Sequence, residues 1–258
     1  MLKALTETSL AGFTVGSRDY FAAQKKLILS RPLLKSCYDQ WYARLLADAR
    51  SVPGRGVLLE LGSGGSYLKD LEPAVVTSDV VDGVADRVVD GRSLPYPDGS
   101  IQALFLTHVL HHIPDVEAFF REAERALMPG GVISMIEVAH TPFARFFFRR
   151  FHPEPYCDKL AEWAFAQRDS MMDSNQALSW MVFVRDLKKF EKLHPRLKLE
   201  ATSYLPWFTY LLAGGVTGRC LVPGFLVRPL VLGESLLRPL SPCFSLHWHL
   251  RVRKVTAS

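Results

Sequence analysis

The run Val57-Leu58-Leu59-Glu60-Leu61-Gly62-Ser63-Gly64-Gly65-Ser66 decides the fold of this 258-residue chain. Its apolar residues and the acid among them predict a short buried strand. The glycines that follow predict a tight turn, because glycine adopts positive φ without steric cost. A strand that ends in such a turn is typical of the start of a nucleotide-type site in an open α/β sheet. We therefore expect a ligand to bind at this turn.

The rest of the chain predicts a parallel sheet with helices on both faces. Apolar strands alternate with helical segments, which is the rhythm of a doubly wound fold. After the first strand, the expected strands are 74–79, 85–90, 101–109, 132–138, 197–205 and 245–255. The expected helices begin at Asp19, after Pro32 and at Pro114, and others cover 67–71, 158–166 and 186–192.

Composition favours a globular protein, with 48% hydrophobic and 22% charged residues. The charge is uneven: residues 1–139 hold 14 Lys/Arg and 17 Asp/Glu, net −3, which leaves 17 and 9, net +8, for residues 140–258. The basic half predicts an anionic partner such as lipid headgroups, phosphate or nucleic acid, and a solvated basic surface is the alternative.

The cysteines and the apolar runs limit the possible environments. None of the four cysteines forms a CxxC pair, so we expect neither a zinc ribbon nor a disulfide framework, and a reducing, cytoplasmic setting fits. Polar residues interrupt the N-terminal segment, and we expect no signal peptide. The charge-free run 201–218 approaches membrane-spanning length, but Pro206 and several glycines argue against a transmembrane helix.

Three acids end the first three predicted strands. Glu60 precedes the glycine turn, and Asp79 lies seventeen residues beyond Gly62. An acid at the position of Asp79 can accept both ribose hydroxyls of an adenosine-type ligand. Asp90 could receive a hydrogen bond from an adenine amino group. Each acid alone is as easily a helix cap or a solvated loop residue, but their order along the chain predicts one cleft.

The glycine turn excludes two common nucleotide sites. Tyr67 stands where a dinucleotide fingerprint needs its third glycine, and no Gly-Lys-Ser/Thr follows as in a P-loop. The turn resembles that of the class I S-adenosylmethionine-dependent methyltransferases, although Ser66 replaces a glycine common in that family. The resemblance covers about residues 55–139 and includes the segments 77–79, 89–96, 106–113 and 127–131. It implies a Rossmann-like, seven-stranded and mostly parallel sheet with an antiparallel last strand, and an enzyme that uses S-adenosyl-L-methionine.

The resemblance also implies roles for individual residues. The turn would pass the methionine end of the cofactor, Asp79 would hold the ribose and Asp90 the adenine. Thr107 and His108 would line the methionine side through backbone groups. The expected cofactor-binding residues are Glu60, Gly62, Ser63, Gly64, Gly65, Asp79, Asp90, Gly91, Thr107 and His108.

The catalytic base is less well determined by the sequence. An imidazole titrates near neutral pH, so His111 and His112 are the candidate bases, with a structural role as the alternative. We expect no metal, because no acid or cysteine completes the histidine group at a typical ligand spacing. Glu137 and His140 follow the fifth strand near the expected acceptor pocket. The pair His247 and His249 is expected to pack or to face solvent.

The resemblance divides the chain into three parts: a helical lead-in or cap at 1–54, a cofactor-binding core at 55–139, and an acceptor-side helical insertion with the last strands at 140–258. The segment 143–151 alternates phenylalanine with arginine, which fits either a helix on a membrane surface or a cover for the sheet edge.

The expected acceptor is therefore a small or lipid-linked molecule, with peripheral membrane contact through the basic, aromatic half. Two alternatives remain open at this stage. One is a nucleic-acid methyltransferase or binder, disfavoured because no nucleic-acid module is recognised. The other is a non-catalytic membrane-surface protein that keeps the fold.

Overall fold

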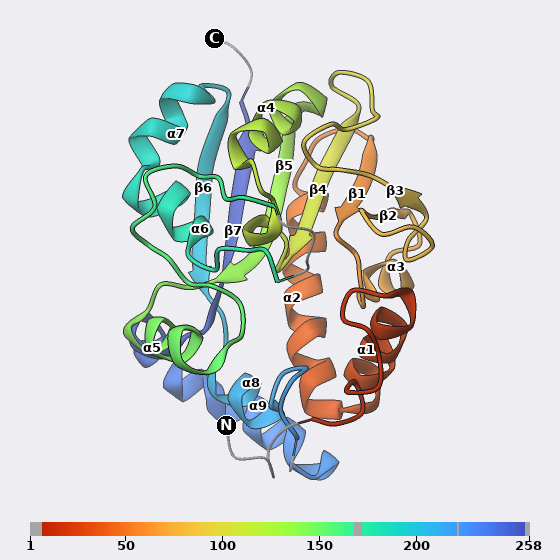
Figure 1. Cartoon of the computed structure of the whole chain (residues 1–258), viewed down its shortest axis with the longest axis vertical. Coiled ribbons are helices and arrows are strands. Elements are labelled where there is room, and N and C mark those ends of the chain that lie inside the picture. The colour runs from red at the N-terminus through yellow and green to blue at the C-terminus, as the bar shows by residue number, and fades with distance from the viewer. Residues whose placement is uncertain (1–6, 168–171, 221, 256–258) are drawn as a thin grey trace.

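One seven-stranded sheet forms the centre of the molecule, in the order β3-β2-β1-β4-β5-β7-β6. The computed structural model describes residues 7–167, 172–220 and 222–255, so the first six residues of the predicted lead-in lie outside it. Strand β7 is antiparallel to both β5 and β6, and the other neighbouring strands pair in parallel, as expected (Figure 1). The strands are β1 (Val57–Leu61), β2 (Val75–Asp79), β3 (Arg87–Val88), β4 (Ile101–Thr107), β5 (Leu127–Val138), β6 (Leu197–Tyr204) and β7 (His247–Lys254).

Helices cover both faces of the sheet. They are α1 (Arg18–Ser30), α2 (Pro32–Arg50), α3 (Leu68–Leu71), η2 (Leu110–His112), α4 (Val116–Ala126), α5 (Pro142–Phe151), α6 (Leu178–Trp180), η3 (Met181–Arg185), α7 (Leu187–Leu193), α8 (Phe208–Ala213), η4 (Gly224–Leu226), α9 (Val227–Glu234), η5 (Ser235–Leu240) and α10 (Ser241–Phe244). Strand β4 shows why both faces need cover. Its side chains alternate between a core shared with α4 and α7 and a core shared with α2.

The first two helices meet at Pro32, as predicted. Proline lacks the backbone N–H that a helix interior needs but is accepted in the first turn, so α1 ends and α2 begins there. Helix α2 is fixed to the sheet by its buried Asp48. That carboxylate accepts hydrogen bonds from Ser134 on β5 at 2.6 Å and from Arg251 on β7 at 2.9 Å, and lies 2.7 Å from His249 Nε2. His249 therefore has the packing role expected of it.

One predicted helix is wrong. Within the segment 158–166 the chain is extended or bent, not helical. The reason is tertiary pairing: Val116 N–H donates to the Trp163 carbonyl, Phe165 N–H donates to the Pro114 carbonyl, and the Trp163 indole donates to Asp186. These bonds attach the segment to the start of α4 and to α7. Strand β5 also begins at Leu127, five residues before its predicted start.

Several helices gather at one end of the sheet. Figure 1 shows α1, α5, α8 and α9 at the end where the parallel strands finish, which is where open α/β sheets bind ligands. The charge-free run 201–218 ends β6 and then forms the short helix α8. Among the described residues, none of the helices combines the length and the hydropathy needed to cross a membrane.

Candidate active site

The glycine turn after β1 has the backbone that its sequence predicts. Gly62 and Gly64 have φ of 58° and 43°, in the left-handed region that favours glycine. A Cβ on Gly62 would lie 2.7 Å from a methyl group of Val109, and one on Gly64 would lie 2.9 Å from the ring of Phe21. The turn is therefore held between α1 and the loop after β4, and two of its glycines are required.

Asp79 supports this turn from the end of β2. Its carboxylate accepts hydrogen bonds from the backbone N–H groups of Gly64 and Val81, both at 3.0 Å. Ser66 has an ordinary negative φ, and its hydroxyl accepts a hydrogen bond from the Leu68 N–H at the start of α3. A third glycine is therefore unnecessary at position 66, which explains the departure from the family pattern.

Three predicted cofactor residues carry buried polar atoms that have no hydrogen-bond partner among the described residues. They are the Glu60 Oε2, the Thr107 Oγ1 and the His108 Nε2 atoms. Glu60 is at the end of β1, and Thr107 and His108 end the neighbouring strand β4, with Leu61 opposite Leu106. Burial raises the pKa of Glu60 to about 7. Unpaired buried polar groups are costly, so this edge of the sheet suits a polar ligand.

His108 has a strained backbone. Its φ of 59° is the only positive value among the described non-glycine residues, and such conformations concentrate at functional sites. The His108 ring is buried, and this burial lowers its pKa to about 4. It is therefore neutral near pH 7.

Asp90 and Gly91 follow β3, next to Asp79. The Val89 N–H donates to the Asp79 carbonyl, which keeps the two acids on adjacent chain segments. Both Asp90 oxygens contact the Arg92 guanidinium, at distances from 2.7 to 3.1 Å, and this contact lowers the pKa of Asp90. A Cβ on Gly91 would lie 3.3 Å from Phe119, a tight contact with the core beneath.

A cleft of about 300 Å³ lies beside the glycine turn. Ser63 and Gly64 line it together with Arg18, Phe21 and Lys25 of α1. The cleft thus includes two of the expected cofactor residues. The other eight, which are Glu60, Gly62, Gly65, Asp79, Asp90, Gly91, Thr107 and His108, do not line it. Gly65 faces Gln24, whose side-chain oxygen would lie 2.5 Å from an added Cβ.

A buried ion-pair cluster follows β4. The His111 Nδ1–H donates to Glu137 at 2.6 Å, and the other oxygen of Glu137 accepts the backbone N–H groups of Val109 and Leu110. The opposite nitrogen of His111 lies 3.5 Å from Glu154. Burial opposes a charge on His111, but the two carboxylates outweigh it and raise its pKa to about 10. His111 is therefore protonated near pH 7 and is not available as a base.

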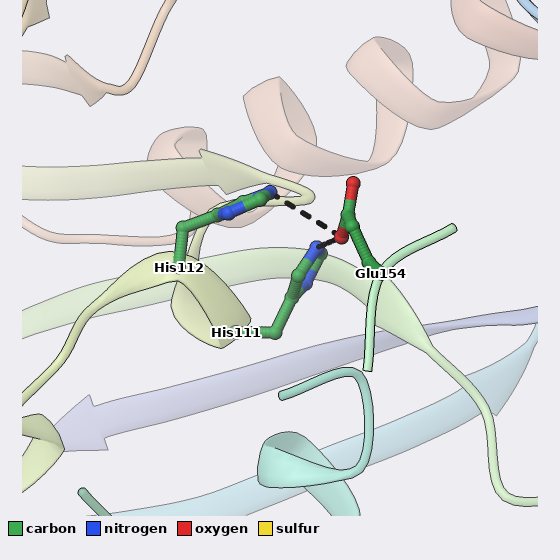
Figure 2. Close-up of side chains that lie close together, drawn as sticks. All are labelled: His111, His112 and Glu154. Carbon is green, nitrogen blue, oxygen red and sulfur yellow. Dashed lines mark ion pairs between the residues drawn. The ribbon is translucent and has the colours of Figure 1, made fainter. Parts of the chain in front are cut away.

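His112 differs from its neighbour. Its Nε2 lies 3.7 Å from the same oxygen of Glu154, and its side chain is 25% exposed, against 3% for His111 (Figure 2). Burial and the charge of His111 lower the pKa of His112 to about 4. Of the two predicted bases, His112 is therefore the neutral and more accessible imidazole.

Glu154 is the functional candidate that the sequence analysis missed. Its carboxylate lies within reach of His111 and His112, accepts a hydrogen bond from Ser174 at 3.2 Å, and contacts Gln176. Burial opposes its ionisation, but the histidines lower the pKa of Glu154 to about 2. Its sequence neighbours, His-Pro-Glu-Pro at 152–155, give no sign that it meets His111 and His112, which lie some forty residues earlier. The reason given for expecting no metal, the lack of a nearby acid, does not hold in three dimensions.

Beside this cluster lies an aromatic group from distant parts of the chain. The His247 ring lies 4.6 Å from His108 and from Tyr210, and 5.3 Å from Trp41, measured between ring centroids. His247 is thus a packing residue, as expected. His140 is placed apart from the cluster, hydrogen-bonded to Tyr156 at 2.7 Å and stacked on Trp180.

Comparisons with known proteins agree with this geometry. Residues 59–135 match the family model described as "Methyltransferase domain". A 27-O-demethylrifamycin SV methyltransferase from Amycolatopsis mediterranei (strain S699) is 40% identical over 58 residues, which cover 22% of this chain and 21% of that protein. The ubiquinone/menaquinone biosynthesis C-methyltransferase UbiE of Desulfotalea psychrophila (strain LSv54 / DSM 12343) is 22% identical over 136 residues, 43% of this chain and 55% of that protein.

The fold has solved counterparts. The geranyl diphosphate C-methyltransferase of Streptomyces coelicolor A3(2) superposes with a TM-score of 0.55 at 16% identity, and the match covers 96% of this chain and 88% of that one. The matches to the two curated relatives span about a fifth and about half of their lengths. The matched segment 59–135 is that of a methyltransferase domain, and the fold is the Rossmann-like fold of the class I S-adenosylmethionine-dependent methyltransferases.

Proposed function

We propose that this protein transfers a methyl group from S-adenosyl-L-methionine to a small-molecule acceptor, and that the acceptor is apolar or lipid-linked. The observation that carries the proposal is the set of buried, unpartnered atoms on Glu60, Thr107 and His108, at the strand ends beside the glycine turn. The matched methyltransferase domain supports the reaction type. The solved counterpart with geranyl diphosphate also contains S-adenosyl-L-homocysteine, which supports this cofactor.

The cofactor would use the residues of the turn as the sequence analysis proposes. Glu60 would face the ammonium group of the methionine end, where Gly62, Ser63, Gly64 and Gly65 let the backbone approach closely. A carboxylate oxygen has two acceptor sites. Asp79 can therefore hold the turn and still accept the ribose hydroxyls.

The remaining cofactor contacts lie on the adjacent segments. Asp90 would share its oxygens between Arg92 and the adenine amino group, with Gly91 beside it. Thr107 and His108 would line the methionine side. When bound, the cofactor supplies an activated sulfonium methyl group, so the protein mainly aligns the acceptor and receives a proton where the acceptor loses one.

We propose that the acceptor's reacting atom enters beside His112. Glu137 and Glu154 hold His111 in place from both sides, and this pair positions η2. His112 keeps a neutral imidazole that can accept a proton. Tyr210, which packs on the buried rings of Trp41 and His247 and is itself partly exposed, would contact an apolar part of the acceptor. In this proposal residues 1–54 and 140–258 form the acceptor side around the core 55–139.

Exposed apolar side chains support an acceptor that is presented at a membrane. Phe225, Leu232 and Leu236 are 79%, 74% and 81% exposed, and they follow one another through η4, α9 and η5. Arg228 and Arg238 of the same segment are also exposed. The single acid within 201–246, Glu234, is buried and accepts hydrogen bonds from the N–H groups that start α8.

A surface of this composition fits the headgroup region of an anionic bilayer, where apolar side chains insert and arginines meet phosphate. The curated relative UbiE is named for ubiquinone/menaquinone biosynthesis, and the solved counterpart is named for geranyl diphosphate. We therefore propose peripheral membrane contact through the segment 224–240.

The direct test is a transfer assay with a radiolabelled methyl donor on lipid, small-molecule, protein and RNA fractions. The proposal expects label in the lipid or small-molecule fraction. Label in RNA would favour the nucleic-acid alternative, and liposome binding without any transfer would favour the non-catalytic alternative. Co-sedimentation with vesicles of phosphatidylcholine and phosphatidylglycerol tests the membrane contact. The double variant Phe225→Ser/Leu236→Ser should then lose binding, while Val184→Ser, an exposed apolar residue of η3, serves as the control.

A further inference from the structure

We propose that His111, His112 and Glu154 form a binding site for one divalent transition-metal ion such as Zn²⁺. Each residue offers one ligand atom, and these three atoms lie within 4.8 Å of one another. Figure 2 shows both imidazoles directed at the same Glu154 oxygen, at 3.5 and 3.7 Å. With an ion between the three ligand atoms, a small inward movement of each side chain would place each atom about 2.0–2.2 Å from the ion.

The surroundings of the three ligands are those of a metal site. A ligating histidine commonly donates its second ring N–H to a carboxylate, which fixes the ring. His111 does this through the 2.6 Å bond from Nδ1 to Glu137, and Glu137 is itself held by two backbone N–H groups. The Nε2 atom of His111 is thereby aimed at Glu154. The ion would replace the proton on this nitrogen, and that proton would leave to solvent. Ser174 and Gln176 donate hydrogen bonds to the same Glu154 oxygen that faces the two histidines, and these bonds fix its position.

The donor set selects the kind of ion. Mg²⁺ and Ca²⁺ prefer oxygen ligands, whereas two imidazoles and one carboxylate suit zinc and related ions. Three protein ligands leave a coordination position open, as in catalytic zinc sites. His112 is the most exposed of the three side chains, so a further ligand would approach from its side. An oxygen of the acceptor would fit there.

The role of this ion rests on the proposed function, but its binding does not. A hydroxyl oxygen of the acceptor bound to the ion would lose its proton more easily, since a bound cation lowers the pKa of a coordinated oxygen. His112 would then be a ligand, and the proton would leave to solvent. Methyl transfer would join the acceptor oxygen to the methyl carbon and break the carbon–sulfur bond of the cofactor.

The test is titration of chelator-treated protein with Zn²⁺ by calorimetry and with Co²⁺ by visible absorption. We expect one ion per chain, with Co²⁺ bands of four- or five-coordinate geometry. His112→Asn and Glu154→Gln should each abolish the site, and Glu137→Gln should weaken Zn²⁺ affinity about 10–100-fold through the orientation of His111. His194→Asn is the matched control, because His194 is also buried and paired with a carboxylate, Glu124, in another part of the fold.

Binding of S-adenosyl-L-homocysteine is measured on the same samples. Unchanged Zn²⁺ affinity in both His112→Asn and Glu154→Gln, or no ion bound by the unaltered protein, overturns the metal site. If the homocysteine ligand still binds in that case, the proposed function stands. If Zn²⁺ binds but S-adenosyl-L-homocysteine does not, the metal site stands and the proposed function is overturned.

Discussion

Two parts of the chain, the proposed cofactor-binding core 55–139 and the proposed acceptor side 140–258, contribute to the candidate site in different ways. In the first, backbone groups form the glycine turn: Gly62 and Gly64 have positive φ, and Asp79 accepts two backbone N–H groups. In the second, side chains from distant loops, such as Glu154 and His247, meet the strand ends. The comparison shows that a turn formed by backbone groups is determined by a short stretch of sequence. A cluster of side chains from distant segments forms only when the whole fold brings them together.

The largest expected effect tests the buried cluster that joins the two segments. Glu137→Ala removes the partner of His111 and the acceptor of two backbone N–H groups. Breaking a buried ion pair leaves an uncompensated charge, and we expect the free energy of unfolding to fall by about 3–5 kcal/mol. Urea denaturation measures this change.

The matched control is Glu200→Ala at the partly exposed pairs with Arg251 and Arg253 on the sheet edge. We expect a loss of at most about 1 kcal/mol there, because water screens such pairs. Equal losses of unfolding free energy in Glu137→Ala and Glu200→Ala would contradict the claim that the buried ion pair contributes more to stability than the partly exposed pairs.

The next effect compares two glycines. Gly62→Ala combines a positive φ with a contact of 2.7 Å to Val109, and should destabilise the fold by about 1–3 kcal/mol and abolish cofactor binding. Gly233→Ala in α9 meets no atom within 4 Å, and should stabilise the fold by about 0.4–1 kcal/mol. Thermal unfolding of both variants measures the contrast. A Gly62→Ala protein as stable as the unaltered chain would contradict the account of the turn.

A smaller effect concerns pH. Burial raises the pKa of Glu60 to about 7, whereas the unfolded chain titrates near 4.5. The folded state thus binds the proton of the Glu60 carboxyl more tightly than the unfolded chain does. The contribution of Glu60 to the free energy of unfolding therefore declines as pH rises from about 4.5 to 7. The ammonium of the cofactor pairs with the ionised carboxylate only. Affinity should therefore rise with pH below about 7, by at most about tenfold per pH unit.

Calorimetry with S-adenosyl-L-homocysteine between pH 5.5 and 7.5 measures this dependence. Glu60→Gln should flatten it, because the amide does not titrate. If affinity changes with pH to the same extent in Glu60→Gln and in the unaltered protein, Glu60 does not contact the cofactor's ammonium group.

The strands of a mostly parallel sheet and the glycine turn could be predicted because their signals are local. Apolar runs end in acids or glycines, and the segment 247–254 alternates as a strand must. The involvement of Glu154 could not be predicted, since the tertiary fold brings 152–157 to the end of β4. The helix expected at 158–166 failed for the same reason: hydrogen bonds to Pro114, Val116 and Asp186 override the local propensity.

Binding of S-adenosyl-L-homocysteine to the unaltered protein and to Asp79→Ala, by calorimetry at pH 7.5, tests the central claim most directly. Asp82→Ala, an exposed acid of the same loop, is the control. The account predicts saturable binding by the unaltered protein and Asp82→Ala, and affinity about 10–100-fold weaker in Asp79→Ala, as two charge-assisted hydrogen bonds are lost. Absence of binding by the unaltered protein, or equal affinity in all three, would contradict it.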